Sequence, residues 1–160
     1  MTDNNGTRPI VVGVDGSAVA EAALRWATDE AARRGSPLKV VTIATRPRLA
    51  YTVPAQPDWV ERAAGQARKA AAANPTVHIR QLRVAGTPGR ALIDAADGAA
   101  MLVVGSRGAG PIARALLGSV GTYCANHARC PVVIVPAPRS AAEPTRIHLG
   151  RIKARLEVAR

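Results

Sequence analysis

Residues 101–122 read MLVVGSRGAGPIARALLGSVGT, and the rest of the chain is organised around this stretch. An apolar run, residues 101–104, predicts a buried strand that meets glycines at Gly105 and Gly108. A second corner follows at Gly118 and Ser119, where a new helix is expected to begin. Glycines let backbone N–H groups approach an anion closely, and the first amides of a helix lack intrahelical partners. The stretch therefore predicts a phosphate-binding loop, and the alternative is two ordinary turns around a short helix.

Length and composition indicate one domain with an aliphatic core. The chain has 160 residues, of which 48% are hydrophobic and only 2% aromatic, so Ala, Val, Leu and Ile must build the interior. The formal net charge is +11, and residues 137–160 contain six basic and two acidic residues. This charge favours anionic ligands. The aromatic residues are scattered instead of interleaved with basic ones, so nucleic-acid binding has no sequence support beyond the charge itself.

The sequence predicts a cytoplasmic protein that does not enter the membrane. The chain opens without the charged and apolar regions of a signal peptide, and its apolar runs fall short of the roughly 20 residues of a membrane span. Cys124 and Cys130 lack the two-residue spacing of redox or zinc pairs, so we expect buried free thiols.

Apolar runs and helical patterns alternate along the chain. Short, β-branched runs predict parallel strands at residues 9–14, 38–43, 77–84, 101–104 and 130–135. Between them, helices are expected at residues 19–34 and 59–73, from Pro88 onward, and at residues 119–128, with Ser17 and Asp58 as N-cap candidates and Gly35 as a stop. The third strand alternates and is expected at an edge. Five strands alternating with four helices predict a doubly wound, five-stranded parallel α/β sheet of the Rossmann-like class.

Ligands of such sheets bind beyond the carboxyl ends of the strands, where the strand order reverses. The residues just past those ends are Asp15, Gly16, Ile43, Gly105 and Gly108. The amides of Gly108, Gly118 and Ser119 could hold phosphate oxygens, with charge added by Arg107 and Arg114. Asp15 suits a ribose hydroxyl or a divalent cation that bridges phosphates, and equally an Asx-turn or helix cap.

Rival motifs and catalytic groups are weak. The Walker A pattern is absent, and residues 108–113 match a dinucleotide-binding fingerprint only by coincidence, because Pro111 interrupts the turn. His78, His127 and His148 lie beside no nucleophile, His127 being expected to meet local helix carbonyls, and Ser119 has no adjacent base. The sequence therefore predicts no catalytic residues.

Taken together, these residues resemble the universal stress proteins, in particular their ATP-binding branch. The motif G-x2-G-x9-G-[ST] is matched by Gly105, Gly108, Gly118 and Ser119, and the resemblance spans residues 9–136. It implies the strand order 3-2-1-4-5, an ATP site (ADP and AMP being the alternatives) with Mg²⁺ or Mn²⁺, and a homodimer that pairs the last strand, Val132 to Val135. The implied metal residue is Asp15, and the predicted nucleotide-binding residues are Val14, Asp15, Gly16, Ile43, Val104, Gly105, Arg107, Gly108, Gly118, Ser119, Val120 and Gly121.

One departure from the family concerns the terminal phosphate. Members often carry a hydroxyl residue near that phosphate, and at this place, beyond Val120, the chain has Gly121, with Thr122 one step later. The loop is therefore better fitted to hold a nucleotide than to cleave it. Residues 137–160 are not part of the family pattern, and we expect them to form a flexible basic tail.

Three functions follow as hypotheses. The first is an ATP-binding regulator of the stress response, acting as a homodimer. The second is a slow, metal-dependent ATPase that relies on Asp15. The third is an adaptor for nucleic acid or another anionic surface, acting through the basic tail.

Overall fold

The computed structural model describes residues 7–44, 58–106 and 118–138. In these ranges strands and helices alternate as the sequence predicts: β1 (Ile10–Gly13), α1 (Ala18–Arg34), β2 (Leu38–Ala44), α2 (Asp58–Ala73), β3 (Ile79–Ala85), α3 (Pro88–Ala95), β4 (Met101–Gly105), α4 (Ser119–His127) and β5 (Val132–Val135). The basic tail, apart from its first two residues, lies outside the described residues.

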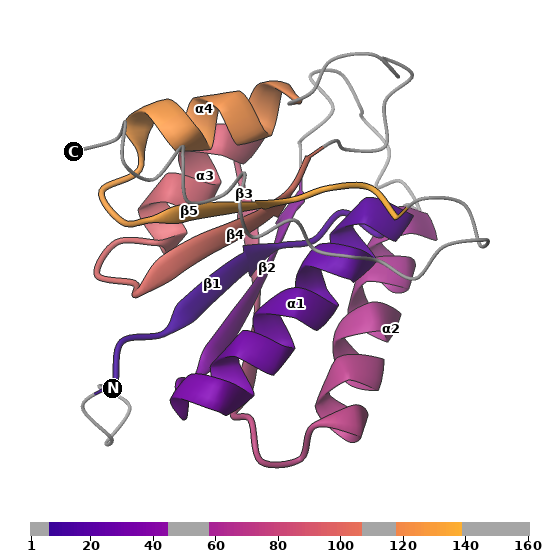
Figure 1. Ribbon diagram of the computed structural model, residues 1–160. Helices are drawn as coiled ribbons and strands as arrows, with labels where there is room; N and C mark the ends of the chain where they lie inside the picture. Colours follow the sequence, from indigo (N-terminus) through magenta and orange to yellow (C-terminus); the bar gives the residue numbers. More distant parts are fainter. Residues whose placement is uncertain (1–6, 45–57, 107–117, 139–160) are drawn as a thin grey trace.

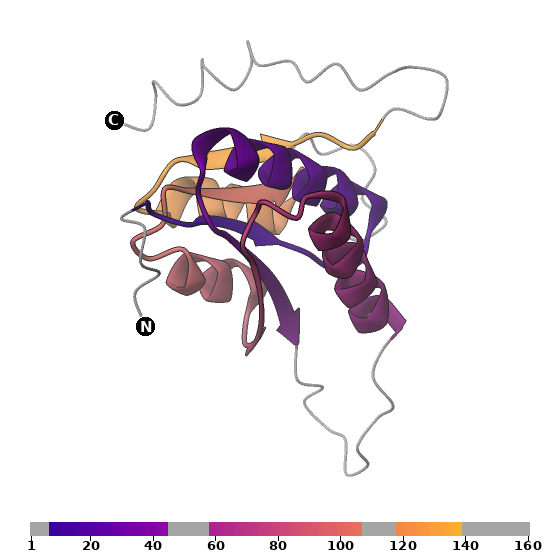
Figure 2. The same cartoon turned by 90° about the horizontal axis from the view of Figure 1, so that it is seen from below.

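The five strands form one parallel sheet in the order β3-β2-β1-β4-β5. Ile10 of β1 is level with Leu38 of β2 on one side and with Met101 of β4 on the other. Figure 1 shows α1 and α2 on one face of the sheet and α3 and α4 on the other, and Figure 2 shows the same layers from below. The predicted doubly wound fold and its strand order are confirmed, and the order reverses at β1.

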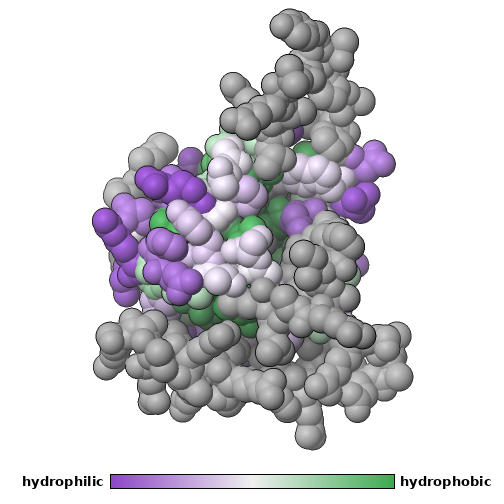
Figure 3. Space-filling model, turned by 90° about the horizontal axis from the view of Figure 1, so that it is seen from above, coloured by the Kyte–Doolittle hydropathy of each residue, from purple (hydrophilic) through white to green (hydrophobic). Residues whose placement is uncertain are grey.

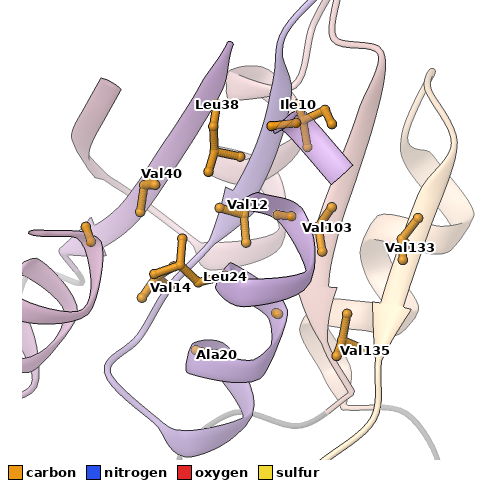
Figure 4. Packing of buried hydrophobic residues seen from close by; sticks show 14 of the residues in the cluster. Ile10, Val12, Val14, Ala20, Leu24, Leu38, Val40, Val103, Val133 and Val135 are labelled. Atoms are coloured by element: carbon orange, nitrogen blue, oxygen red, sulfur yellow. The ribbon is translucent and has the colours of Figure 1, made fainter. Parts of the chain in front are cut away.

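Helix α1 packs on the sheet through its small residues. Ala20, Leu24, Ala27 and Ala31 are buried, as their spacing predicts. The Ser17 hydroxyl accepts a hydrogen bond from the Ala20 N–H at 3.1 Å, and Gly35 ends the helix at φ 60°, so both predicted caps are confirmed. Figure 4 shows Leu24 lying against the valines of β1 and its continuation.

The opposite face of the sheet has a second aliphatic core under α3 and α4. Its fully buried members include Val11, Val41, Leu102 and Cys124. Tyr123 of α4 is the large hydrophobic residue that remains exposed among the described residues, at 37%. On the face seen in Figure 3, the coloured residues are mostly hydrophilic or intermediate, with hydrophobic ones in small areas between them.

Several predicted boundaries move by one or two residues, and the last strand begins at Val132 instead of Cys130. The edge strand begins at Ile79, not Val77, because a turn bond from the Val77 N–H to the Asn74 carbonyl, 3.0 Å long, occupies that backbone; Val77 is nevertheless buried in the core. Asp58, the predicted N-cap of this helix, is instead the first residue of α2 itself. Among the described residues, the helices are too short or too polar to cross a membrane.

Candidate functional site

The carboxyl ends of β1, β2 and β4 define the candidate site. In a parallel sheet, successive residues direct their backbone groups alternately to the two neighbouring strands. The Val14 N–H donates to the Val41 carbonyl at 2.9 Å, so Val41 faces β1, and Ile43, two residues on, faces the same side. Because β1 ends at Gly13, which is level with Val41, the amide and carbonyl of Ile43 face the space beyond the end of β1.

Gly105 flanks the same space from the other side. The Leu102 N–H donates to the Pro131 carbonyl and the Ser106 N–H to the Val135 carbonyl, so the even-numbered residues of β4 face β5. Gly105 is odd-numbered and faces β1, whose last register partner on β4 is Val103. Ile43 and Gly105 thus lie on either side of the point where strand order reverses, which is where α/β sheets place their ligands.

The loop after β1 is an Asx-turn. Oδ1 of Asp15 accepts a hydrogen bond from the Ser17 N–H at 3.0 Å. This local role was one of the two alternatives that the sequence leaves open. Val14 is buried in the core under α1, so only its backbone is placed to contribute to a site at this edge.

Gly118 is the N-cap of α4, with φ −69° and ψ 164°. Its N–H donates to the Ser106 carbonyl at 2.6 Å, and the first bond of the helix runs from the Thr122 N–H to the Gly118 carbonyl. The Gly118 amide is therefore engaged by the protein itself, contrary to the expectation that it holds phosphate. The amides of Ser119, Val120 and Gly121 lie in the first turn of α4. Amides in the first turn of a helix have no acceptor within the helix and need one outside it.

Side chains at the start of α4 divide between solvent and core. Ser119 is exposed, Val120 is half-buried against the core under α3 and α4, and Gly121 is buried. Val104 is likewise a core residue, 3% exposed.

Part of the predicted site is not described. Arg107 and Gly108 lie outside the described residues, as does Arg114. Within the described part of the chain, His, Cys, Asp and Glu side chains form no cluster of three or more that would hold a metal ion. The cation-binding residue predicted from the sequence is Asp15 alone, and it belongs to no such cluster.

Sequence reasoning missed two residues. Ser106 is buried and links β5 to the N-cap of α4 through its own amide and carbonyl. Its signal was a polar residue directly after a buried strand, between the motif glycines. Gln66 contacts the loop after β1 from α2, and its signal was an amide among alanines on the face of a helix that contacts the sheet.

Comparison with known proteins places this chain in a family. Residues 6–136 match the model of the universal stress protein family. The chain is 36% identical over 154 residues to a universal stress protein of Mycolicibacterium smegmatis, covering 86% of this chain and 51% of that protein. It is 35% identical over 150 residues to universal stress protein Rv3134c of Mycobacterium tuberculosis, covering 92% and 56%. The chain spans about half the length of these curated relatives.

Solved structures agree with this assignment. One, a universal stress protein in complex with cAMP, is 31% identical with a TM-score of 0.62, over 82% of this chain and 98% of that one. Another, the universal stress protein from Archaeoglobus fulgidus in complex with dAMP, is 27% identical with a TM-score of 0.58, over 80% and 97%. The fold and the edge described above define an α/β protein of the Rossmann-like class. This chain belongs to the universal stress protein family.

Proposed function

We propose that this chain binds an adenine nucleotide at the carboxyl ends of β1, β2 and β4. The observation that carries the proposal is the convergence there of three elements: the Asx-turn at Asp15, the backbone of Ile43, and Gly105 with the N-terminus of α4. The cAMP and dAMP complexes of two similar family members support the adenine class. ATP is the proposed ligand, with ADP and AMP as the alternatives.

Each element has a proposed part. The backbone of Ile43 hydrogen-bonds adenine, and Asp15, Gly16 and Gly105 lie along the ribose. Phosphates meet the first-turn amides of α4, the hydroxyl of Ser119 and the segment that contains Arg107 and Gly108. The positive end of a helix and its unpaired amides favour such an anion.

The proposed cation, Mg²⁺ or Mn²⁺, would rest mainly on the phosphates. Mg²⁺ is commonly held by one or two carboxylates together with substrate phosphates and waters. Asp15 supplies one carboxylate, and the absence of a larger acidic cluster among the described residues fits this division. The ion would neutralise phosphate charge beside the first-turn amides of α4.

The proposed role is regulatory. Nucleotide occupancy would change the surface of a cytoplasmic homodimer that pairs Val132 to Val135 of two copies, and so transmit a stress signal. Support comes from family membership and from β5 lying at the edge of the sheet. Within the described residues, the site offers a carboxylate and amides but no base beside Ser119.

Titration of ATP against two variants tests the site. Ser119→Ala is expected to weaken ATP binding about tenfold, since a hydrogen bond to a charged group is worth about 1.5–3 kcal/mol. Gly118→Ala is expected to weaken it as well, because the added methyl group would stand beside the phosphates. Gly118 has a negative φ that any residue adopts, so a loss in Gly118→Ala reports crowding of the ligand and not backbone strain. Asn126→Ala, an exposed change at the other end of α4, is the control and is expected to bind like the wild type.

Unchanged affinity in both site variants would exclude this edge as the phosphate site.

Slow hydrolysis of ATP is the second candidate function, and the Asp15 carboxylate favours it. It requires release of phosphate above a heat-treated control that disappears in Asp15→Asn; absence of turnover with either Mg²⁺ or Mn²⁺ leaves a binding protein.

A further inference from the structure

Two hydrogen bonds link helix α2 to the loop that carries Asp15. Nε2 of Gln66, on α2, donates to the carbonyls of Gly16 and Ser17, each at 3.3 Å. Ser17 in turn donates its N–H to Oδ1 of Asp15 at 3.0 Å. The partners of Gln66 are therefore the two residues that directly follow Asp15, one of which bonds the carboxylate.

The same loop touches the backbone of α2. Gly16 has φ 77°, and a Cβ at this position would lie 2.6 Å from the Trp59 carbonyl oxygen and 3.2 Å from Cβ of Arg62. A side chain at this residue would need both a strained backbone and a displaced helix. Glycine is thus explained by the approach of α2, independently of any ligand.

The amide of Gln66 is held in one orientation at a cost. Its Oε1 is buried and has no hydrogen-bond partner among the described residues. Exchanging the two amide atoms would set Oε1 against two carbonyl oxygens, so Nε2 must face the loop. A buried unpaired acceptor destabilises the fold, and an apolar side chain would avoid that cost. The functional part of the Gln66 side chain is therefore its Nε2 donor, which faces the loop after β1.

We propose that Gln66 is a positioning residue for nucleotide binding: through the carbonyls of Gly16 and Ser17 it sets the place of the Asp15 carboxylate. This inference rests on the proposed function, because Asp15 is one wall of the proposed site. It makes α2, which contributes no predicted site residue, a determinant of the affinity for nucleotide.

The test replaces Gln66 by Met, which has a similar shape and no donor. Gln66→Met is expected to weaken ATP binding about three- to tenfold, the scale of one or two lost neutral hydrogen bonds. In the Asp15→Asn background, which keeps an oxygen for the Ser17 N–H, the same change is expected to have less than about a twofold effect, because its route to the ligand is gone. Equal losses in both backgrounds would overturn the inference. Gln81→Met, the same change at an exposed position of β3, is the control.

A second measurement does not depend on nucleotide. Hydrogen exchange of the Ser17 amide is expected to accelerate in Gln66→Met, while exchange at Val12 and Val103 in the core stays unchanged. Unaltered exchange at Ser17 overturns the inference, even where ATP binds. A wild-type protein that binds no ATP, ADP or AMP overturns the proposed function, and the exchange result then still decides whether Gln66 holds the loop.

Discussion

At the scale of single residues, the two cysteines differ more than their sequence suggests. Cys124, on the inner face of α4, is fully buried, whereas Cys130 is half-buried, so the expectation of two buried thiols holds fully only for the first. Burial, and then the neighbouring Cys130, raise the pKa of Cys124 to about 11. Burial also raises the pKa of Cys130, by an amount that backbone hydrogen bonds and Arg8 reduce. Both remain thiols at neutral pH.

Alkylation of the folded protein is expected to separate them. The thiolate is the reactive form, so at pH 8 iodoacetamide should modify Cys130 at least about tenfold faster than Cys124, and the rate for Cys124 should still be rising at pH 10. Mass spectrometry of peptides from timed samples measures both rates, with urea-unfolded protein as the control in which they converge. Equal rates in the folded protein would show that Cys124 is accessible.

At the scale of elements, α3 packs against α4 at a glycine, Gly89, which faces Tyr123 of α4. A Cβ on Gly89 would lie 2.6 Å from Cδ1 and 2.9 Å from Cγ of Tyr123, whose ring stacks on His127 with centroids 4.2 Å apart. The ring of His127 is also fixed, since its Nδ1 lies 2.9 Å from the Tyr123 carbonyl. This contact confirms the expectation that His127 meets a local helix carbonyl.

Gly89→Ala is therefore expected to destabilise the protein by about 1–3 kcal/mol, because an added methyl group must displace the Tyr123 ring. Gly65→Ala is the matched control on α2, where the nearest atom to an added Cβ is the mobile end of Arg68 at 3.9 Å. It should stabilise by about 0.5–1 kcal/mol, the propensity difference between the two residues. Urea unfolding measures both. Equal effects of the two changes would contradict the close packing of α3 on α4.

At the scale of the whole molecule, β5 is the last strand of the sheet, and no other described strand pairs with its outer side. Pro131 and Val135 direct their carbonyls to β4, so Val132 and Ile134 direct their backbone groups outward. The proposed homodimer would use those outward groups. Proline is tolerated on an edge strand where its missing N–H faces away from the sheet.

If the proposed dimer forms through β5, Ile134→Pro is expected to convert it into a folded monomer, because the change removes an outward donor and leaves the ladder to β4 intact. Light scattering after size exclusion measures the mass, and circular dichroism checks the fold. Val133→Pro is the contrasting variant: it removes a donor that faces β4 and should lower the melting temperature strongly. A dimer that persists in Ile134→Pro would place the interface elsewhere.

The sequence by itself determined the layered α/β fold, and it predicted the edge of the sheet at which the nucleotide site is proposed. Short runs rich in Val and Ile and bounded by Gly and Pro favour buried strands, and the caps at Ser17 and Gly35 are local chemistry that a reader of the sequence can recognise. The start of α4 at Ser119 followed from the same kind of signal. These features depend on neighbours in the chain, so pattern and spacing reveal them.

Only the tertiary structure decided how the residues of that edge are used. The Gly118 amide bonds Ser106, Gly16 is a glycine because α2 approaches it, and Gln66 reaches the loop from fifty residues away. Each of these is a contact between elements distant in sequence, and its geometry depends on how helices and strands pack. Periodicity records which face of an element is buried, but it does not record which atom on that face meets a given carbonyl.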